Sequence, residues 1–197
     1  KIKQSMYFPD RLIESEKYTL SDLLDRYKSE VLPDKRARGQ PGQLEWWKVQ
    51  LGEYKLKDLT PAVIAKFRDK LTKEMSDRTG RKRTSSTVNR YLALLGHACT
   101  IAIKEWQWMA VNPVIQISKP REAQGRIRFL SDDERGRLLV VCKSSESVHL
   151  FTIVTLALST GMRRGEILGL LWENVDLQNR RITLVRTKNG ERRVIPL

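Results

Sequence analysis

The chain has 197 residues, of which 37 are Lys or Arg and 23 are Asp or Glu, so its formal net charge is +14 at pH 7. So large a positive excess favours a polyanionic partner. Hydrophobic residues make up 40% of the chain, which supplies a core and excludes wholesale disorder. No apolar run approaches the roughly 20 residues of a membrane-spanning helix, and the first residues, KIKQ, show no signal-peptide pattern.

Cysteine and histidine are sparse in this sequence. Cys99 and Cys142 each lie inside an apolar helical pattern, which argues against a disulfide framework and favours a reducing cytoplasm. The two histidines and two cysteines are widely scattered, so the sequence shows no metal-ligand spacing. No metal site is therefore predicted.

The first part of the chain predicts an all-helical unit. An N-terminal connecting segment, residues 1–18, precedes this unit, which covers residues 19–115. Thr19 can cap a first helix, because apolar residues follow it at helical spacing, namely Leu20, Leu23, Leu24 and Tyr27. The elements that follow are a basic loop over residues 33–42, a short helix over 44–51, a helix that starts at Thr60-Pro61, and a long helix from Ser85 or Ser86 to about Trp106.

A second unit is predicted over residues 129–197, after a basic linker over residues 116–128 that has little apolar content. Its elements are, in order, a helix from the capping box of Ser131 and Glu134 to about Lys143, a nearly all-apolar helix over 148–159, a helix over 164–170, and strands over 181–186 and 191–196 around a turn at 188–190. The apolar helix is expected to be buried on most sides and to end at Gly161. The predicted fold class is mostly α, with a helical bundle followed by an α+β unit that contains a small antiparallel sheet.

Two short segments contain side chains suited to binding a phosphate. Arg163 emerges where the apolar helix ends and the next helix starts, a position from which an arginine can grip a phosphate through paired hydrogen bonds. Glu166 lies on the same helical face and could hold this guanidinium, although a plain surface Arg–Glu pair is an equal alternative. Lys188 lies at the hairpin turn, where it is either a solvated turn residue or a mobile cation for a phosphodiester. The residues alone leave these alternatives open.

Longer motifs add a family resemblance. The segment TGMRRGEILGLLWENVDLQNRRITLVRTKNGERRVIPL closely resembles the start of the catalytic domain of the tyrosine recombinases, particularly the phage-type integrases. The segment SSTVNRYLALLGHACTIAIKEWQWMAVNPV is similar to the helical core-binding domain of that family, a SAM-like bundle, and FLSDDERGRLL resembles the entry helix of its catalytic domain. The resemblance covers residues 19–197.

The resemblance implies roles for three residues. Arg163 corresponds to the first catalytic arginine of the family, which contacts the scissile phosphate. Glu166 corresponds to the acid that supports this site, and Lys188 to the hairpin lysine that protonates the departing 5′ oxygen. Family members use neither metal nor ATP, so no cofactor is expected. A tyrosine attacks the phosphate to give a 3′-phosphotyrosine, which a 5′-hydroxyl of another strand resolves.

The resemblance also implies a setting and partners. The parent protein is expected to be a site-specific DNA recombinase that works on double-stranded DNA in the cytoplasm of a bacterium, associated with the nucleoid. Such enzymes act as tetramers on paired DNA sites. No membrane partner is expected.

The chain departs from the family pattern in one respect. The family continues after this sheet with His-x-x-Arg, a His or Trp and the nucleophilic tyrosine, whereas this chain stops at Leu197. None of its five tyrosines is at that position, and Tyr27 and Tyr91 lie on apolar stripes that favour core packing. We therefore expect these residues to bind DNA without cleaving it. A monomer is one alternative for their oligomeric state. The rival hypothesis is a non-catalytic DNA-binding or architectural protein that keeps part of a recombinase fold.

Basic and hydroxyl residues cluster where the resemblance implies DNA contact. Residues 78–90 hold five basic residues and no acid, and residues 180–193 hold six basic residues and one acid. The predicted DNA contacts at the start of the long helix and in the linker are Arg81, Lys82, Arg83, Ser85, Ser86, Thr87, Asn89, Arg90, Lys119, Arg121, Arg126 and Arg128. Asn89 and Arg90 could reach bases in a groove, or one of them could instead cap or tether a neighbour. Core or edge packing, rather than stacking on bases, is expected for Trp46, Trp47, Trp106 and Trp108.

Overall fold

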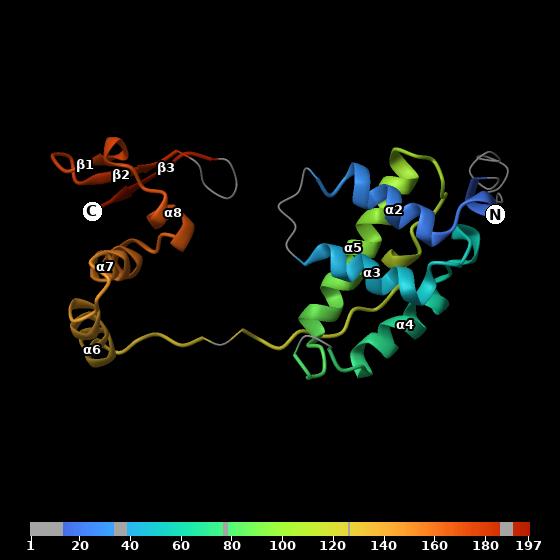
Figure 1. Cartoon of the computed structure of the whole chain (residues 1–197), viewed down its shortest axis with the longest axis horizontal. Coiled ribbons are helices and arrows are strands. Elements are labelled where there is room, and N and C mark those ends of the chain that lie inside the picture. Colours follow the sequence, from blue (N-terminus) through green and yellow to red (C-terminus); the bar gives the residue numbers. More distant parts are fainter. Residues whose placement is uncertain (1–13, 34–38, 77–78, 126, 186–190) are drawn as a thin grey trace. The chain divides into compact units, whose positions relative to one another are not determined.

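The computed structural model describes residues 14–33, 39–76, 79–125, 127–185 and 191–197. The chain divides into two compact units, Lys1–Gly125 and Arg126–Leu197 (Figure 1). The first unit contains helices, and the second combines helices with a three-stranded antiparallel sheet. The predicted mostly α fold class is confirmed. No helix within the described ranges is long and apolar enough to cross a bilayer.

The long helix α5, Ser85–Lys104, runs through the middle of the first unit (Figure 1). It packs against four other elements of the unit, which include the short 3-10 helix η3. The elements around it are α2 Leu20–Glu30, α3 Gln40–Leu51, η2 Leu56–Asp58, α4 Pro61–Lys73 and η3 Pro113–Gln116. The buried residues of α5 recur at helical spacing and are Val88, Leu92, Leu94, Leu95, Ala98, Cys99 and Ala102. The core of the unit is built around this face.

Side-chain caps fix where the helices of the first unit begin. Thr19 caps α2 as predicted, and its capping box is completed by Asp22, whose carboxylate accepts the Thr19 amide at 2.8 Å. Helix α5 begins at Ser85, with Thr84 as its cap. It ends at Lys104, two residues before the predicted boundary, because the chain turns away and Gln107 has a left-handed φ of 58°.

The predicted loop over residues 33–42 is wrong at its C-terminal end. Helix α3 already begins at Gln40, so Pro41 and Gly42 lie in its first turn. Gly39 turns the chain into the helix with a left-handed φ of 88°, and a proline in the first turn loses no intrahelical hydrogen bond. The basic part of this loop, residues 34–38, lies outside the described residues.

Tryptophan packing in the first unit follows the prediction. Trp47 is fully buried, and Trp108 is buried with its ring stacked on Tyr18 at a centroid distance of 3.8 Å. Trp46 and Trp106 are half-buried and pack against the same core. The four indoles are therefore part of the core or its edge, as expected.

The two tyrosines with predicted core positions also pack there. Tyr27 is buried, and its hydroxyl forms a 2.9 Å hydrogen bond with Nδ1 of His97. Tyr91 is half-buried and contacts the edge of the Trp46 ring. Both hydroxyl-bearing rings serve the packing of the helical unit.

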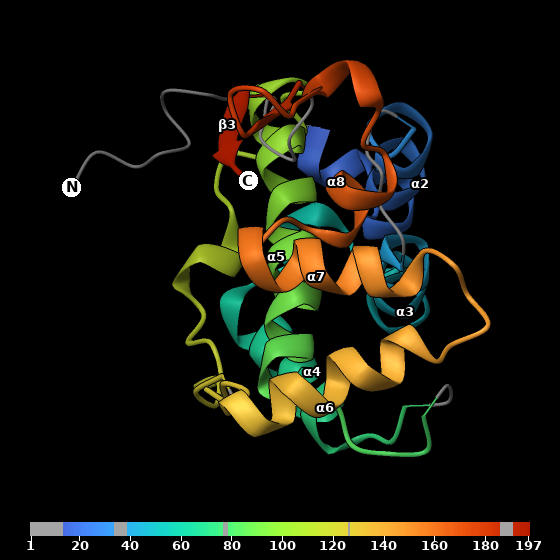
Figure 2. The ribbon, with the colours of Figure 1, turned by 90° about the vertical axis from the view of Figure 1, so that its left-hand side faces the viewer.

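In the second unit, two helices lead into a corner and a small sheet. Helices α6 and α7 pack together, with the chain reversing direction between them (Figure 2). The elements are α6 Asp132–Lys143, α7 Leu150–Thr160, α8 Arg164–Leu168, η4 Trp172–Asn174, β1 Val175–Asp176, β2 Arg181–Leu184 and β3 Arg193–Pro196. Strand β2 lies between β1 and β3, and both pairings are antiparallel. A small core joins the corner to the sheet through Met162, Ile167, Ile182, Leu184 and Ile195.

Several details of the second unit differ from the prediction. Helix α7 was expected to be buried on most sides, yet none of its residues is buried. The apolar composition of α7 favours burial. Among the described residues of this unit, however, too few side chains pack against the helix to bury it. Strand β2 ends at Leu184, and residues 186–190, which include the predicted turn, lie outside the described residues. Helix α8 ends at Leu168, two residues early, and the short strand β1 was not predicted.

Candidate active site and nucleic-acid interface

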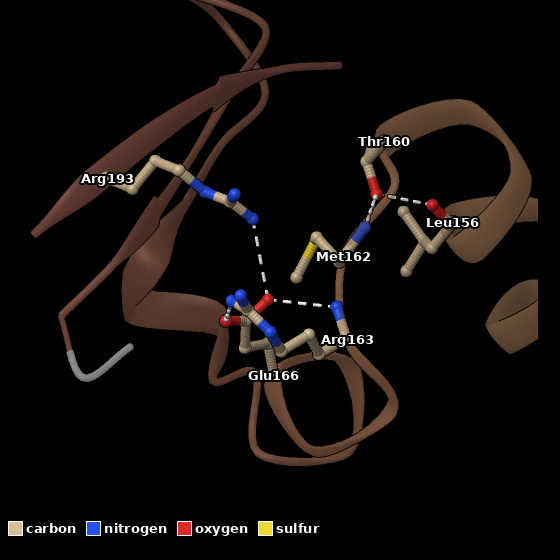
Figure 3. Close-up of polar contacts among 6 residues, drawn as sticks. All are labelled: Leu156, Thr160, Met162, Arg163, Glu166 and Arg193. Atoms are coloured by element: carbon tan, nitrogen blue, oxygen red, sulfur yellow. Dashed lines mark hydrogen bonds and ion pairs between the residues drawn. The ribbon is translucent and has the colours of Figure 1, made fainter. Parts of the chain in front are cut away.

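The corner between α7 and α8 positions Arg163. Helix α7 ends at Gly161, whose left-handed φ of 63° matches the predicted C-terminal cap. The Thr160 hydroxyl donates to the Leu156 carbonyl and accepts the Met162 amide at 3.3 Å (Figure 3). The Met162 side chain is buried in the core of the unit. The chain is thus fixed on both sides of the turn just before Arg163, which is the N-cap of α8.

The carboxylate of Glu166 lies at the centre of the corner (Figure 3). Its Oε2 accepts the Arg163 amide at 2.9 Å, and its Oε1 accepts Nη1 of the Arg163 guanidinium at 3.0 Å. Nη2 of Arg193, from β3, lies 3.4 Å from Oε2. The Glu166 side chain is only 7% exposed, whereas those of Arg163 and Arg193 are 56% and 47% exposed. One covered carboxylate therefore holds two guanidiniums that stay open to solvent.

Electrostatics keep Glu166 ionised in this arrangement. The hydrogen bond from the Arg163 amide, reinforced by the Arg163 guanidinium and the charge of Arg193, holds the pKa of this carboxyl below its ordinary value of 4.5. At neutral pH the cluster is one anion between two cations. Most guanidinium N–H groups of Arg163 and Arg193 are not used by Glu166, so they can donate to an added anion such as a phosphate.

Arg193 was not among the predicted site residues. Its place follows from the register of the sheet, because Leu184 pairs with Arg193 and Ile182 pairs with Ile195. Alternate residues of a strand share a face, so Arg193 lies on the same face as the buried Ile195. The alternation of residues along this strand was the sequence signal that could have placed Arg193 beside the site. The predicted lysine of the hairpin, Lys188, lies outside the described residues.

The start of α5 presents part of the predicted nucleic-acid interface. Arg81, Lys82 and Arg90 are exposed, and no side-chain hydrogen bond or ion pair engages Arg81 or Lys82 within the described ranges. The Thr84 hydroxyl accepts the Thr87 amide at 3.3 Å and contacts the Thr87 hydroxyl at 3.0 Å. The hydroxyl residues at this end are half-buried, namely Ser85, Ser86 and Thr87. The cations are thus available to a polyanion, while the hydroxyls lie closer to the protein.

Arg83 is used within the fold instead. Its side chain is 9% exposed, and Nη1 lies 3.7 Å from a carboxylate oxygen of Glu74. The same nitrogen donates to the Met75 carbonyl at 3.4 Å, and the guanidinium lies over the Tyr91 ring. These contacts fasten the segment before α5 to the helical unit.

Asn89 is also used internally, as a tether. Its Nδ2 donates to the Pro120 carbonyl at 3.0 Å and to Oε1 of Glu122 at 2.7 Å. The tether that the sequence allowed for Asn89 is present, and contact of Asn89 with DNA stays a prediction. The neighbouring Arg90 is exposed.

The basic residues of the predicted linker have different surroundings. Lys119 and Arg121 are exposed in a segment without helix or strand. Arg128 forms an ion pair with Glu134, the residue that completes the capping box of α6. Arg126 lies outside the described residues.

Comparison with known proteins identifies the family of this chain. Residues 128–197, which include the arginine corner and the sheet, match the family described as "Phage integrase family". The chain is 36% identical over 185 residues to the "Shufflon-specific DNA recombinase" of Escherichia coli, a match that covers 92% of this chain and 47% of that protein. Residues 128–197 therefore form a domain of the phage integrase family.

Other integrases show a more distant likeness. The integrase of Salmonella phage P22 is 25% identical to this chain over 199 residues, which cover 91% of the chain and 50% of that integrase. The chain spans about half the length of the curated relatives it matches.

Solved integrase structures share the fold. A Tn1549 transposon integrase in complex with circular intermediate DNA matches 91% of this chain and 61% of its own, with a TM-score of 0.63 and 17% identity. A lambda integrase tetramer bound to a Holliday junction matches 100% of this chain and 55% of its own, with a TM-score of 0.66 and 21% identity. The chain therefore shares its fold with these integrases.

Proposed function

We propose that this chain binds duplex DNA and is part of a site-specific DNA recombinase, an integrase, whose complete form exchanges strands through a 3′-phosphotyrosine. The observation that carries the proposal is the covered Glu166 carboxylate with the guanidiniums of Arg163 and Arg193 on it, inside a phage integrase family domain. The relatives named as a DNA recombinase and as integrases support it.

In this proposal Arg163 contacts the scissile phosphate. A phosphate under attack gains negative charge on its non-bridging oxygens, and a guanidinium already in place stabilises that charge. Glu166 keeps Arg163 in position through its two hydrogen bonds, so it acts as a positioning residue. Arg193 adds a second cation to the same anionic group. The family resemblance assigns to Lys188 the protonation of the departing 5′ oxygen, which avoids expulsion of an alkoxide.

We propose that the nucleophile is not among the five tyrosines of these 197 residues, since all five precede the sheet. Tyr27 is buried against the helical core and bonded to His97, and Tyr91 is half-buried with its ring against Trp46. We propose that these residues alone bind DNA without cleaving it. A monomer is one alternative for their oligomeric state. For the complete protein we propose a tetramer on paired DNA sites in a bacterial cytoplasm, in association with the nucleoid. The lambda integrase tetramer on a Holliday junction supports this assembly.

DNA binding is assigned to the exposed cations, because sequence-independent affinity comes from neutralised phosphates. These are Arg81, Lys82, Arg90, Lys119 and Arg121, with Arg126 and Arg128 as further candidates in the linker. The residues around the start of α5 that offer hydroxyl or amide groups, Ser85, Ser86, Thr87 and Asn89, are assigned secondary contacts, and Arg83 supports the site from within the fold.

The experiment that tests the catalytic proposal uses the complete protein. Arg163→Ala is compared with Arg164→Ala, a neighbouring arginine outside the Glu166 cluster, in strand exchange between supercoiled DNA sites taken from the junctions that flank the gene. We expect Arg163→Ala to reduce strand exchange at least about 100-fold, the scale for losing one preorganised charge donor, with DNA affinity changed by less than about threefold. Equal losses for the two variants contradict the assignment. A complete protein that binds DNA but exchanges no strands supports the rival architectural function.

A further inference from the structure

The segment that follows η3 is fastened to the helical unit. Residues 118–122, here called the strap, contain no helix or strand and belong to the first compact unit. Nη1 of Arg68, from α4, donates to the Ser118 carbonyl at 2.7 Å. Asn89, from α5, donates to the Pro120 carbonyl at 3.0 Å. Side chains of two helices therefore hold the strap against the unit at both of these carbonyls.

Glu122, at the end of the strap, places a negative charge beside polar and basic residues of α5. Its Oε1 accepts the second N–H of the Asn89 amide at 2.7 Å. This hydrogen bond, the nearby Ser86 hydroxyl, and the charges of Arg90 and Lys119 lower the pKa of the Glu122 carboxyl, so it is ionised at neutral pH. The one carboxylate in this group faces residues that are proposed to contact DNA.

The groups around Glu122 are those a DNA phosphate needs. An amide N–H, a hydroxyl and two nearby cations form hydrogen bonds or ion pairs with a carboxylate or with a phosphodiester, because both are oxygen anions. A phosphate cannot accept the Asn89 N–H that Glu122 already accepts, and the negative charge of Glu122 repels the phosphate. Oδ1 of Asn89 is buried with no hydrogen-bond partner among the described residues, so the present arrangement does not satisfy this amide fully.

We propose that Glu122 is a resident anion that occupies the seat of a DNA backbone phosphate at the start of α5 and is displaced when DNA binds. The Asn89 N–H then passes from the carboxylate to the phosphate, and the Ser86 hydroxyl donates to the same phosphate, while the Pro120 carbonyl keeps the strap on α5. This inference rests on the proposed DNA binding. It means that Glu122 weakens binding to DNA, whereas a residue that only fastens the strap does not.

The test compares two variants that each remove one negative charge. Glu122→Gln keeps the size of the side chain and an oxygen that can accept from Asn89, and Glu105→Gln removes an exposed acid from the opposite end of α5. Affinity for a fluorescent duplex of about 30 base pairs is measured by anisotropy at about 150 mM salt. We expect Glu122→Gln to bind about fivefold more tightly than the unaltered chain and Glu105→Gln to stay within about twofold, in keeping with the modest strength of exposed charge contacts.

Two failures of this experiment are distinct. If the unaltered chain does not bind the duplex even at about 50 mM salt, the proposed DNA binding itself is wrong. If it binds, and the two variants gain equally or Glu122→Gln binds less tightly, the displaced-anion inference alone is overturned.

A second measurement follows the donor directly. The NMR signals of the Asn89 side-chain amide should move when duplex is added to the unaltered chain, because the acceptor of one N–H changes. The same signals should already be displaced in Glu122→Gln, since that variant replaces a charged acceptor with a neutral one. Signals that stay unmoved at saturating duplex overturn the inference.

Discussion

Replacement of Asn112 by alanine should destabilise the helical unit by an amount that the structure allows us to work out. Asn112 is 6% exposed, and its Nδ2 donates to the Gly96 carbonyl at 2.8 Å and to the Thr100 hydroxyl at 3.0 Å. Its Oδ1 accepts the Val114 amide at 3.0 Å, which caps η3. Three hydrogen bonds at about 1 kcal/mol each give a loss of about 3 kcal/mol in the free energy of unfolding.

Urea unfolding followed by tryptophan fluorescence measures this loss. Four of the five tryptophans lie in the core or at the edge of the helical unit, and the fifth, Trp172, is 82% exposed, so the signal reports this unit. With an m-value of about 2 kcal/mol/M, the midpoint should fall by about 1.5 M. Thr72→Ala, which removes one exposed hydrogen bond to the Arg68 carbonyl within the same unit, is the control and should leave the midpoint nearly unchanged. A shift for Asn112→Ala no larger than the control, at an unchanged m-value, refutes the reasoning.

Three further outcomes follow from the second unit. Gly161→Ala should lower the free energy of unfolding by about 1 kcal/mol, because φ is 63° there although no atom lies within 4 Å of an added Cβ. Gly136→Ala, inside α6 where an added Cβ also meets no atom within 4 Å, should raise the free energy of unfolding by about 0.5–1 kcal/mol. Chemical denaturation of both variants checks this, and changes of the same sign contradict the reasoning. Glu166→Gln should flatten the acid dependence of stability: the lowered pKa of Glu166 means that its contribution is present above its ordinary 4.5 and is lost as pH falls through the folded value. Between about pH 6 and pH 3 the free energy of unfolding should therefore fall more steeply for the unaltered chain than for Glu166→Gln. Parallel curves for the two proteins contradict the described cluster.

Local signals predicted those elements of the fold that depend on nearby residues. The capping box of Ser131 and Glu134 opens α6, and this helix ends at Lys143 as predicted, because caps and apolar period act within a few residues. Helix α7 shows the limit of such signals. Its composition predicted burial, but burial depends on which other segments cover a helix, and periodicity carries no information on that.

The candidate site was predictable to the same extent. Arg163 and Glu166 are three residues apart, so their contact followed from helical spacing. Arg193 joins them from a strand 27 residues later in the chain, and only the register of β2 and β3 brings it there. The role of Asn89 stayed open for a similar reason, because its partner Glu122 is 33 residues away. Contacts between distant segments depend on the tertiary fold and not on local pattern.

The covered carboxylate of Glu166 has an entropic consequence for ligand binding. A free arginine side chain samples many rotamers, and fixing it costs up to about 2 kcal/mol. In this chain the Glu166 contacts already restrict Arg163 and Arg193 before any phosphate arrives, and the intervening negative charge offsets the repulsion between the two cations. Folding of the domain therefore bears the ordering cost in advance, and an incoming phosphodiester meets donors that need little rearrangement.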